Sequence, residues 1–291
     1  MIDLHIHTTY SDGDKNVEEI LKMCEEKRLE YIAITDHNTC KQYEDKEIKE
    51  NSIFSGVIIK GAELNANFKN KKIELLAYNI KETRIIEEWA EKYFSEEILR
   101  RQQEESKNKL LKICDKKGLI YDENKIEKNI PLTDYITIYV YKELMRHKEN
   151  YKILGKYAES LNYFIRNGLM NPESDFYIED KHKPMYKDVI DVIHKAGGLA
   201  FLAHPFEYRI EDTFEFIDEL RKECELDGIE CFHPSANENE RKELVKYARD
   251  NDLFISGGSD YHGKKNPDVE LGIGKGDLNI SKEIIMEWIT R

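Results

Sequence analysis

Several features that are common in proteins are scarce or missing in this chain of 291 residues. Its five cysteines are scattered and form no C-x-x-C pair, which excludes a disulfide-rich scaffold and a cysteine zinc knuckle. No apolar run approaches the ~20 residues that span a bilayer, and the first residues lack the basic start and apolar core of a signal peptide. We therefore expect a cytoplasmic protein with reduced thiols and no membrane partner.

Basic residues are outnumbered by acidic ones. The chain has 45 Lys and Arg against 58 Asp and Glu, a formal net charge of −13. Such a chain repels the phosphate backbone of nucleic acids unless a local cation reverses the field, so we expect no stable nucleic-acid complex. The hydrophobic fraction of 40%, with 17 Tyr and 11 Phe, is enough to bury a core and excludes global disorder.

Strand-like and helix-like segments alternate in the first and last thirds of the chain. Seven short apolar runs predict strands, at Ile2–His7, Tyr31–Thr35, Val57–Leu64, Ile73–Ile80, Leu199–Ala203, Gly228–Phe232 and Leu253–Ser256. Amphipathic patterns predict helices at Asn16–Lys27, Tyr186–Lys195, Asp212–Cys224 and Asn237–Asp250. This alternation is typical of an α/β protein with a mainly parallel sheet, and seven strands favour a barrel over a short open sheet.

Residues 83–183 interrupt this alternation. They are rich in charge and mostly helical in pattern, as in Ile85–Lys117 and Leu132–Asn167, although the β-branched and aromatic residues of 135–141 favour a strand locally. We interpret residues 83–183 as a helical insertion, a lid or substrate subdomain, in a barrel formed by residues 1–82 and 184–291.

Histidines and carboxylates recur where the predicted strands end. His5 and His7 end the first strand, and side chains two residues apart on a strand point to the same face. Further groups of this kind follow the same strand or end later ones, namely Asp12, Asp36, His37, Glu63, His204, Asp260 and His262. Loop-facing groups converge at the carboxyl ends of barrel strands, and nitrogen and oxygen ligands without cysteine suit Zn²⁺, Mn²⁺ or Fe²⁺. The sequence therefore predicts a metal centre.

Five ordered motifs carry a family resemblance. They read H-I-H-T-T-Y-S-D-G, I-T-D-H-N-T, G-A-E-L, A-G-G-L-A-F-L-A-H-P and S-G-G-S-D-Y-H-G, and they lie within residues 1–78 and 188–274. The set resembles the polymerase-and-histidinol-phosphatase (PHP) family of metal-dependent phosphoesterases, and within it the stand-alone nucleotide 3′,5′-bisphosphate phosphatases. The resemblance implies a distorted seven-stranded (βα) barrel that holds two or three divalent ions.

The resemblance also implies which residues bind each ion. The first ion would be held by His5, His7, Glu63 and Asp260, the second by the bridging Glu63 and by His204, and the third by Asp12, His37 and His262. The family usually supplies one more histidine to the second ion, at a position where this chain has Glu74. We expect Glu74 to be the ligand instead, which would shift the preference toward Mn²⁺ or Mg²⁺. The alternative is that the second ion binds weakly and Glu74 is a solvated strand residue.

From these ligands we expect hydrolysis of a phosphomonoester in a small phosphorylated metabolite, with a nucleotide as one candidate. His5, His7, Glu63 and Asp260 would act through a hydroxide held by the ions, and His233 would touch the substrate or protonate the leaving group. The candidates for phosphate binding are Arg209, Arg100, Arg101 and Arg166, with His182 as a weaker one. The Arg-x-His element that grips substrate in the bisphosphate phosphatases is missing.

Neighbouring residues are expected to support this site. Tyr10, Asp36, Asn38 and Ser259 are candidates to orient the ligands. The pair Gly257-Gly258 would either let backbone pass close to the site or adopt positive φ.

Three other functions stay open at this point. One is a histidinol-phosphate phosphatase, which the pattern of the insertion disfavours. Another is a metallohydrolase that cleaves a carboxylic ester, amide or lactone with the same metal centre. The third is a non-catalytic PHP module that binds metal for structure, against which the nearly complete ligand set argues.

Overall fold

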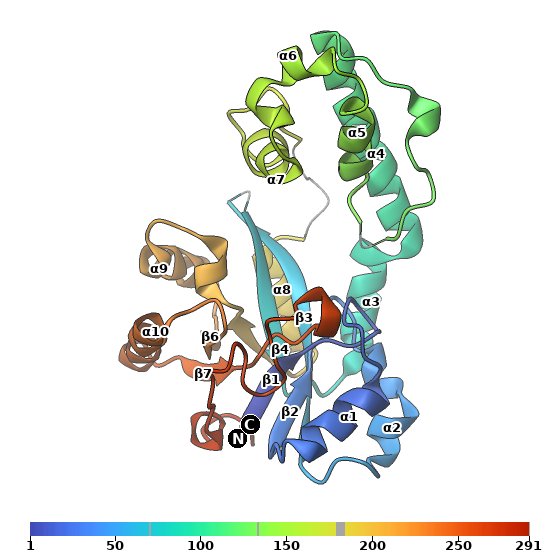
Figure 1. The fold of residues 1–291 in the computed structure, drawn as a ribbon. Coiled ribbons are helices and arrows are strands. Elements are labelled where there is room, and N and C mark those ends of the chain that lie inside the picture. Colours follow the sequence, from blue (N-terminus) through green and yellow to red (C-terminus); the bar gives the residue numbers. More distant parts are fainter. Residues whose placement is uncertain (70, 133, 179–183, 291) are drawn as a thin grey trace. The chain divides into compact units, whose positions relative to one another are not determined.

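The computed structural model describes residues 1–69, 71–132, 134–178 and 184–290 (Figure 1). Contacts divide the chain into two compact units, Met1–Glu91 with Lys183–Arg291, and Lys92–His182. The role of residues 83–183 as a lid or substrate subdomain remains a proposal.

The first unit is built on a sheet whose strands follow one another in sequence order. They are β1 (Ile2–Ile6), β2 (Tyr31–Ile34), β3 (Val57–Phe68), β4 (Lys71–Tyr78), β5 (Leu199–Leu202), β6 (Gly228–Phe232) and β7 (Phe254–Gly257). A parallel bridge between Ile6 and Tyr261 joins the two edges of this sheet, so the barrel is nearly closed. The predicted seven-stranded α/β barrel is confirmed.

Strand β4 accounts for the distortion of the barrel. It runs antiparallel to both β3 and β5, whereas the other four neighbouring pairs are parallel. Strand β3 also continues to Phe68, four residues beyond the predicted end at Leu64, because its last residues pair with the start of β4. The sheet is therefore mainly parallel, as predicted, with one reversed strand.

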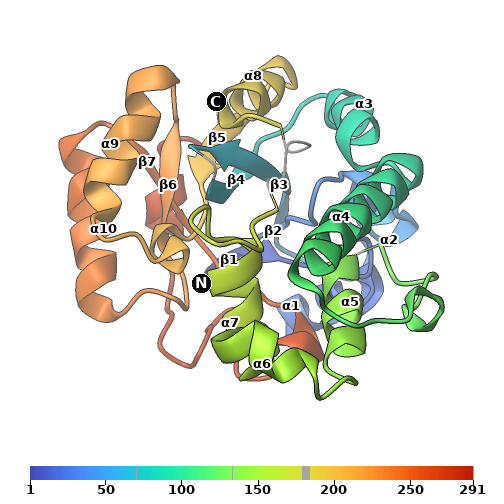
Figure 2. The same ribbon diagram turned by 90° about the horizontal axis from the view of Figure 1, so that it is seen from above.

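Helices surround the strands in the view from above (Figure 2). They include α1 (Val17–Glu26), α8 (Tyr186–Lys195), α9 (Thr213–Glu223) and α10 (Glu238–Asp250), while α2 (Lys46–Glu50) and α3 (Thr83–Phe94) follow β2 and β4 in the chain. Helix α1 begins at a capping box in which Asn16 and Glu19 satisfy each other's backbone N–H groups. Its buried residues pack against Ile6, Ile32 and Ile34, the outward face of the first two strands.

The opposite face of the strands forms the interior of the barrel. Alternate strand residues build an apolar cluster there that includes Ile2, Leu4, Ala33, Ile59, Leu76, Tyr78, Phe201 and Trp288. Because strand side chains alternate, Glu63 lies on the same face of β3 as Ile59, and Glu74 lies on the same face of β4 as Leu76. Both carboxylates therefore point into the barrel.

The second unit is helical and has its own apolar core. Its helices are α4 (Glu96–Lys117), α5 (Ile136–Leu144), α6 (Asn150–Leu154) and α7 (Leu161–Tyr163). In α5 the buried Ile136, Val140 and Leu144 recur every four residues, so packing of one helical face outweighs the β propensity of this segment. Among the helices of the described chain, none is both long and apolar enough to cross a membrane.

Candidate metal centre

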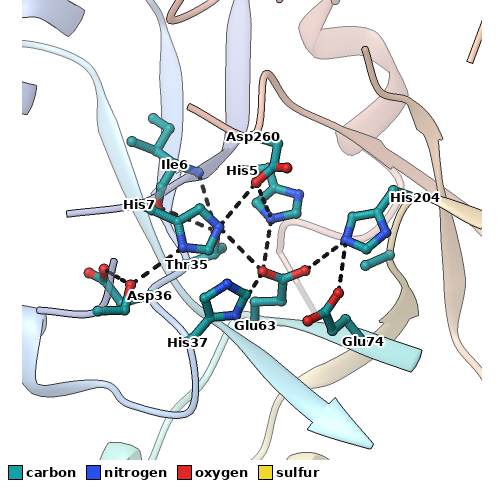
Figure 3. A network of polar contacts seen from close by, with 12 residues as sticks. His5, Ile6, His7, Thr35, Asp36, His37, Glu63, Glu74, His204 and Asp260 are labelled. Carbon is teal, nitrogen blue, oxygen red and sulfur yellow. Dashed lines mark hydrogen bonds and ion pairs between the residues drawn. The ribbon is translucent and has the colours of Figure 1, made fainter. Parts of the chain in front are cut away.

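The carboxylate of Glu63 lies at the centre of a ring of imidazoles (Figure 3). Its Oε2 atom is 3.3 Å from Nε2 of His5, 3.3 Å from Nε2 of His7 and 3.1 Å from Nδ1 of His37. Its Oε1 atom is 2.9 Å from Nε2 of His204. Three strands, β1, β2 and β5, thus direct four ring nitrogens at the two oxygens of one buried carboxylate.

Asp260 completes the first predicted ligand set. Its Oδ1 atom lies 3.3 Å from Nε2 of His5 and 3.2 Å from Nε2 of His7. Ligands held at 2.0–2.2 Å from one ion lie about 3.0–3.5 Å from each other, which is the spacing found between these atoms. The structure therefore brings together His5, His7, Glu63 and Asp260 with separations that suit a shared divalent cation.

A second group forms around Asp12. Its Oδ1 atom is 3.1 Å from Nε2 of His262 and 3.8 Å from Nε2 of His37, the set predicted for the third ion. His7 approaches the same oxygen with its other nitrogen, Nδ1, at 3.6 Å. The rings of His7 and His262 stack with centroids 4.0 Å apart, so the ligand group around Asp12 lies directly beside the one around Glu63.

Glu74 reaches the remaining side of the centre. Its Oε2 atom is 3.5 Å from Nε2 of His204, and one of its oxygens lies within 4.8 Å of ligand atoms of His37 and Glu63. Its Oε1 atom is paired with Nζ of Lys72 at 2.7 Å. The carboxylate that replaces the family's histidine therefore lies where a second ion would need a ligand.

The protonation of two rings indicates that a cation belongs between these groups. Nδ1 of His5 is 2.9 Å from the Glu230 carboxylate, and Nδ1 of His262 is 2.9 Å from the backbone oxygen of Asp260. Both acceptors require a proton on Nδ1, so in the neutral rings the Nε2 lone pairs face the oxygens of Glu63, Asp260 and Asp12. The lone pairs of neutral rings repel carboxylate oxygens at such distances unless a cation lies between them. The residues present fit divalent ions.

The charge balance of the cluster leads to the same result. Burial lowers the pKa of His7, but the carboxylates of Asp260 and Glu63 outweigh this effect and raise it to about 10. The pKa of His204 is likewise raised to about 10, against burial, by Glu63 and Glu74. The side chains of the cluster thus create a strongly negative field that favours positive charge.

Backbone geometry at the strand ends is unusual. His204 after β5 has φ 25°, and Asp260 after β7 has φ 55°, conformations that side chains with a Cβ rarely adopt. A Cβ on Gly258 would meet the backbone nitrogen of His5 at 2.3 Å, so the predicted close approach of backbone is observed. The alternative, positive φ at the Gly257-Gly258 pair, is not found.

Two buried acids of the centre were missed in the sequence. Glu230 binds Nδ1 of His5 and accepts a hydrogen bond from the backbone N–H of His204 at 2.8 Å. Asp3 accepts hydrogen bonds from the backbone N–H and hydroxyl of Ser259 and from the backbone N–H of His5. A charged residue inside an otherwise apolar strand is the signal that could have identified both.

The residues predicted to orient the ligands behave differently from one another. Asp36 accepts hydrogen bonds from the backbone N–H of Thr8 at 2.8 Å and from the Ser11 hydroxyl at 2.6 Å, which holds the loop that carries Asp12. The side chain of Asn38 accepts a hydrogen bond from a backbone N–H of β3. Tyr10 is exposed and donates to Asp45.

The predicted substrate contacts are spread over both units. In the first unit, His233 ends β6 with Nε2 3.4 Å from Oδ2 of Asp260, and Arg209 is exposed on the turn after β5. In the second unit, Arg100 donates to a backbone carbonyl, Arg101 pairs with Glu105 at 3.9 Å, and Arg166 is exposed. His182 lies outside the described residues.

Comparison with known proteins gives relatives of similar length. The chain is 28% identical over 268 residues to a phosphoribosyl 1,2-cyclic phosphate 1,2-diphosphodiesterase from Eggerthella lenta, covering 90% of this chain and 94% of that protein. It is 26% identical to a 5′-3′ exoribonuclease from Haemophilus influenzae, covering 98% of this chain and 97% of that one.

Solved structures share the fold. A provisionally named metal-dependent phosphoesterase from Bifidobacterium adolescentis has a TM-score of 0.64 at 22% identity, covering 98% of this chain and 94% of that one. An amidohydrolase from Chromobacterium violaceum has a TM-score of 0.60 at 18% identity, covering 90% and 88%. The family model of the PHP domain matches residues 3–232. The chain therefore belongs to the PHP family of metal-dependent phosphoesterases.

Proposed function

We propose that this protein hydrolyses a phosphomonoester in a small phosphorylated metabolite with the help of two or three divalent ions. The observation that carries the proposal is the arrangement around Glu63, whose two oxygens face four imidazoles at 2.9–3.3 Å. Mn²⁺, Zn²⁺ or Fe²⁺ suits these nitrogen and oxygen ligands, and the carboxylate of Glu74 adds Mg²⁺ to the candidates.

The side chains would divide the work as follows. Glu63 would bridge two ions, one on the side of His5 and His7 and one on the side of His204. Glu230 would keep the ring of His5 in the form whose Nε2 can be a ligand. Bound divalent ions supply positive charge for the phosphate and lower the pKa of water from 15.7 toward ~7.

A covalent intermediate on cysteine has no support in the structure. Cys40, which follows the I-T-D-H-N-T motif, is buried, and burial raises the pKa of its thiol well above the ordinary value. A thiol held in its protonated form is a poor nucleophile. Direct attack by water is the route that these residues favour.

Hydrolysis of a phosphodiester is the second candidate. It is favoured by the names of the relatives, a cyclic phosphate diphosphodiesterase and a 5′-3′ exoribonuclease. The same metal centre could serve either reaction, because in both of them water attacks phosphorus and an alcohol leaves. What differs is the space and charge around the substrate rather than the ligands of the ions.

The experiment is a hydrolysis panel with the purified protein in Mn²⁺, Mg²⁺ or Zn²⁺. The panel contains nucleoside monophosphates, a nucleoside 3′,5′-bisphosphate, histidinol phosphate, sugar phosphates, a 1,2-cyclic phosphate and a short 5′-phosphorylated RNA, with an acyl ester for comparison. His7→Ala and Asp260→Ala are measured beside the unaltered protein, together with their metal content and circular dichroism.

We expect phosphate release from at least one monoester, and loss of at least 10³-fold in both variants while the fold is kept. Cleavage of the cyclic phosphate or RNA alone would replace the first candidate by the second. Cleavage of the acyl ester alone, or full activity in either variant, would exclude the phosphoesterase centre described above.

A further inference from the structure

His233 has its proton on the opposite nitrogen from His5 and His262. The backbone N–H of Ser235 donates to Nδ1 of His233 at 3.1 Å. A nitrogen that accepts this hydrogen bond carries no proton, so the neutral ring bears its proton on Nε2. The rings of His5 and His262 have the reverse arrangement, with a lone pair on Nε2. His233 is therefore a hydrogen-bond donor at Nε2, whereas His5 and His262 are suited to bind a cation there.

Within the described part of the chain, Nε2 of His233 makes no hydrogen bond and has only a long contact with a carboxylate. The side chain is 4% exposed, and Nε2 makes no hydrogen bond with any residue that the structure describes. The nearest acid is Asp260, whose Oδ2 atom lies 3.4 Å away, without the geometry of a hydrogen bond. Leaving a buried N–H without an acceptor costs free energy, so a ligand that accepts this hydrogen bond would be favoured.

The ring of His233 lines a small polar pocket beside the metal centre. The pocket has a volume of about 100 Å³, and its lining includes Ser235, Asp260, Asn266, Lys275 and the rim residue Glu207. This space is large enough for a compact polar group such as phosphate.

The lining of the pocket offers several donors. Besides Nε2–H of His233, it has the amide of Asn266 and the ammonium group of Lys275. The hydroxyl of Ser235 is already engaged, because it donates to the unprotonated Nδ1 of His233 at 2.7 Å. Lys275 lies on an exposed turn, between Gly274 and Gly276, both of which have positive φ. Asp260 contributes negative charge, but its Oδ1 atom is turned toward His5 and His7 and would be neutralised by an ion held there.

We infer that this pocket binds the phosphate group of the substrate, with His233 donating a hydrogen bond from Nε2 to a phosphate oxygen and Lys275 supplying positive charge at the rim. The inference rests on the proposed phosphoesterase function. It specifies that the phosphate group binds on the side of the metal centre where His233 lies. It makes His233 and Lys275 substrate-binding residues and excludes His233 as a metal ligand.

The competing role for His233 is support of Asp260, as a residue that positions a metal ligand. The two roles predict different losses. A positioning residue would change metal content when it is removed, because Asp260 would lose its orientation. A phosphate-binding residue would change the affinity for phosphate and leave the metal content as it was.

The test measures binding of inorganic phosphate to the Mn²⁺-loaded protein by titration calorimetry, with metal content determined on the same samples. The variants are His233→Ala, His233→Gln and Lys275→Ala. Lys265→Ala is the matched control, since Lys265 is an exposed lysine of the same C-terminal region that does not line the pocket.

We expect the Kd for phosphate to rise about tenfold in His233→Ala and about threefold in Lys275→Ala, with unchanged metal content. His233→Gln, which keeps an N–H donor, should recover part of the affinity, and Lys265→Ala should match the unaltered protein. Because Lys275 is exposed, its variant decides the question even where a His233 variant fails to fold.

Two results would overturn the inference alone. In the first, the unaltered protein hydrolyses phosphate esters, but Lys275→Ala and the His233 variants bind phosphate with the same Kd as the unaltered protein. In the second, His233→Ala has lost its metal. A protein that neither binds phosphate nor hydrolyses any ester of the panel would overturn the proposed function, and this inference with it.

Discussion

Glu74 is the residue in which this chain departs from the ligand pattern of its family. It points into the barrel from β4, where its oxygens are shared between Nε2 of His204 at 3.5 Å and Nζ of Lys72 at 2.7 Å. The ammonium group of Lys72 offsets the charge that the replacement of a neutral imidazole by a carboxylate adds. A harder ligand at this position favours Mn²⁺ or Mg²⁺ over Zn²⁺.

We predict that Glu74→His shifts the metal preference toward Zn²⁺. The measurement is the ratio of Zn to Mn retained after dialysis of the protein against equal concentrations of both ions, for which we expect a rise of severalfold. Glu243→His on the exposed side of α10 is the control for adding a histidine to the surface. An unaltered ratio would mean that Glu74 is not a ligand.

The other candidate ligands differ in how far the sequence predicted them. Most of the set could be named from motif positions alone, and the structure gathers those residues into one place. Glu230 could not be named, because its role depends on a contact with His5, which is 225 residues away in the chain. The proton position on His233 depends on the backbone of Ser235, and residue type alone does not specify it.

At the scale of elements, the end of β7 passes against the end of β1. Gly258 makes this contact, and a Cβ there would lie 2.3 Å from the nitrogen and 2.5 Å from Cβ of His5. Both of these atoms belong to a buried strand residue that cannot move without displacing the metal centre. A side chain at this position would therefore separate the two strands.

Gly258→Ala should destabilise the protein by roughly 3 kcal/mol, the upper end of the usual cost of overpacking a core. Urea unfolding followed by circular dichroism measures the change, and metal content should fall as well because His5 is displaced. Stability and metal content equal to those of the unaltered protein would show that the strands can separate at little cost.

Helix α8 is joined to the segment before β6 by an ion pair between His194 and Asp227. Nε2 of His194 is 2.7 Å from Oδ2 of Asp227, which also accepts a hydrogen bond from the backbone N–H of Ala200 at 2.7 Å. The hydrogen bond with Asp227 raises the pKa of His194, and partial burial opposes this only in part. Protonated His194 therefore stabilises the folded state.

The sign of the pH effect follows from this raised pKa. The contribution is fully present below the unfolded pKa of ~6.5 and is lost as pH rises through the higher folded value. Since the pair is partly exposed, we predict that His194→Asn costs about 0.5 kcal/mol at pH 5.5 and almost nothing at pH 9. Guanidinium unfolding at both pH values measures the loss of unfolding free energy in His194→Asn. An equal loss at pH 5.5 and pH 9 would contradict the stabilising role of protonated His194.

At the scale of the whole molecule, every candidate metal ligand belongs to the first unit. The second unit has a separate apolar core and contains three of the four candidate arginines, Arg100, Arg101 and Arg166. The candidate metal ligands and three of the four arginines predicted to bind substrate therefore belong to different units.

Replacing residues 92–182 with a short flexible linker should leave the metal content as it is and change the substrate choice. The removal of the three candidate arginines, Arg100, Arg101 and Arg166, should raise KM for phosphate esters severalfold, because their charge and donors are lost. Metal analysis and the hydrolysis panel of the unaltered protein provide the measurement. Unchanged relative rates across the panel would reject a role of the second unit in specificity.

Five carboxylates lie close together where the ions would bind. Asp12, Glu63, Glu74, Glu230 and Asp260 repel one another when no cation is present, so removal of metal should destabilise the first unit. An ion at 100 times its Kd adds about 2.7 kcal/mol, which corresponds to a Tm higher by roughly 5–10 °C. Calorimetry with EDTA and with added Mn²⁺ tests this, and equal Tm values would speak against a bound ion.

The amino-acid sequence by itself determined the existence of the seven strands of the first unit and of helices α1, α8, α9 and α10, whereas the short helix α2 was not predicted. The residues of β6 and α8 match their predicted ranges, because apolar periodicity is a local property. It also determined the chemistry of the centre, since histidine and carboxylate side chains at strand ends suit few other purposes in such a pattern.

Only the tertiary structure decided the reversed direction of β4, the helical state of Ile136–Leu144 and the partners of each imidazole. Strand direction depends on which neighbours pair, and helix formation in a β-branched segment depends on the core that its apolar face meets. The proton on His233 and the lone pairs of His5 and His262 depend on hydrogen bonds made across the folded chain. Such interactions exist only once distant residues have come into contact.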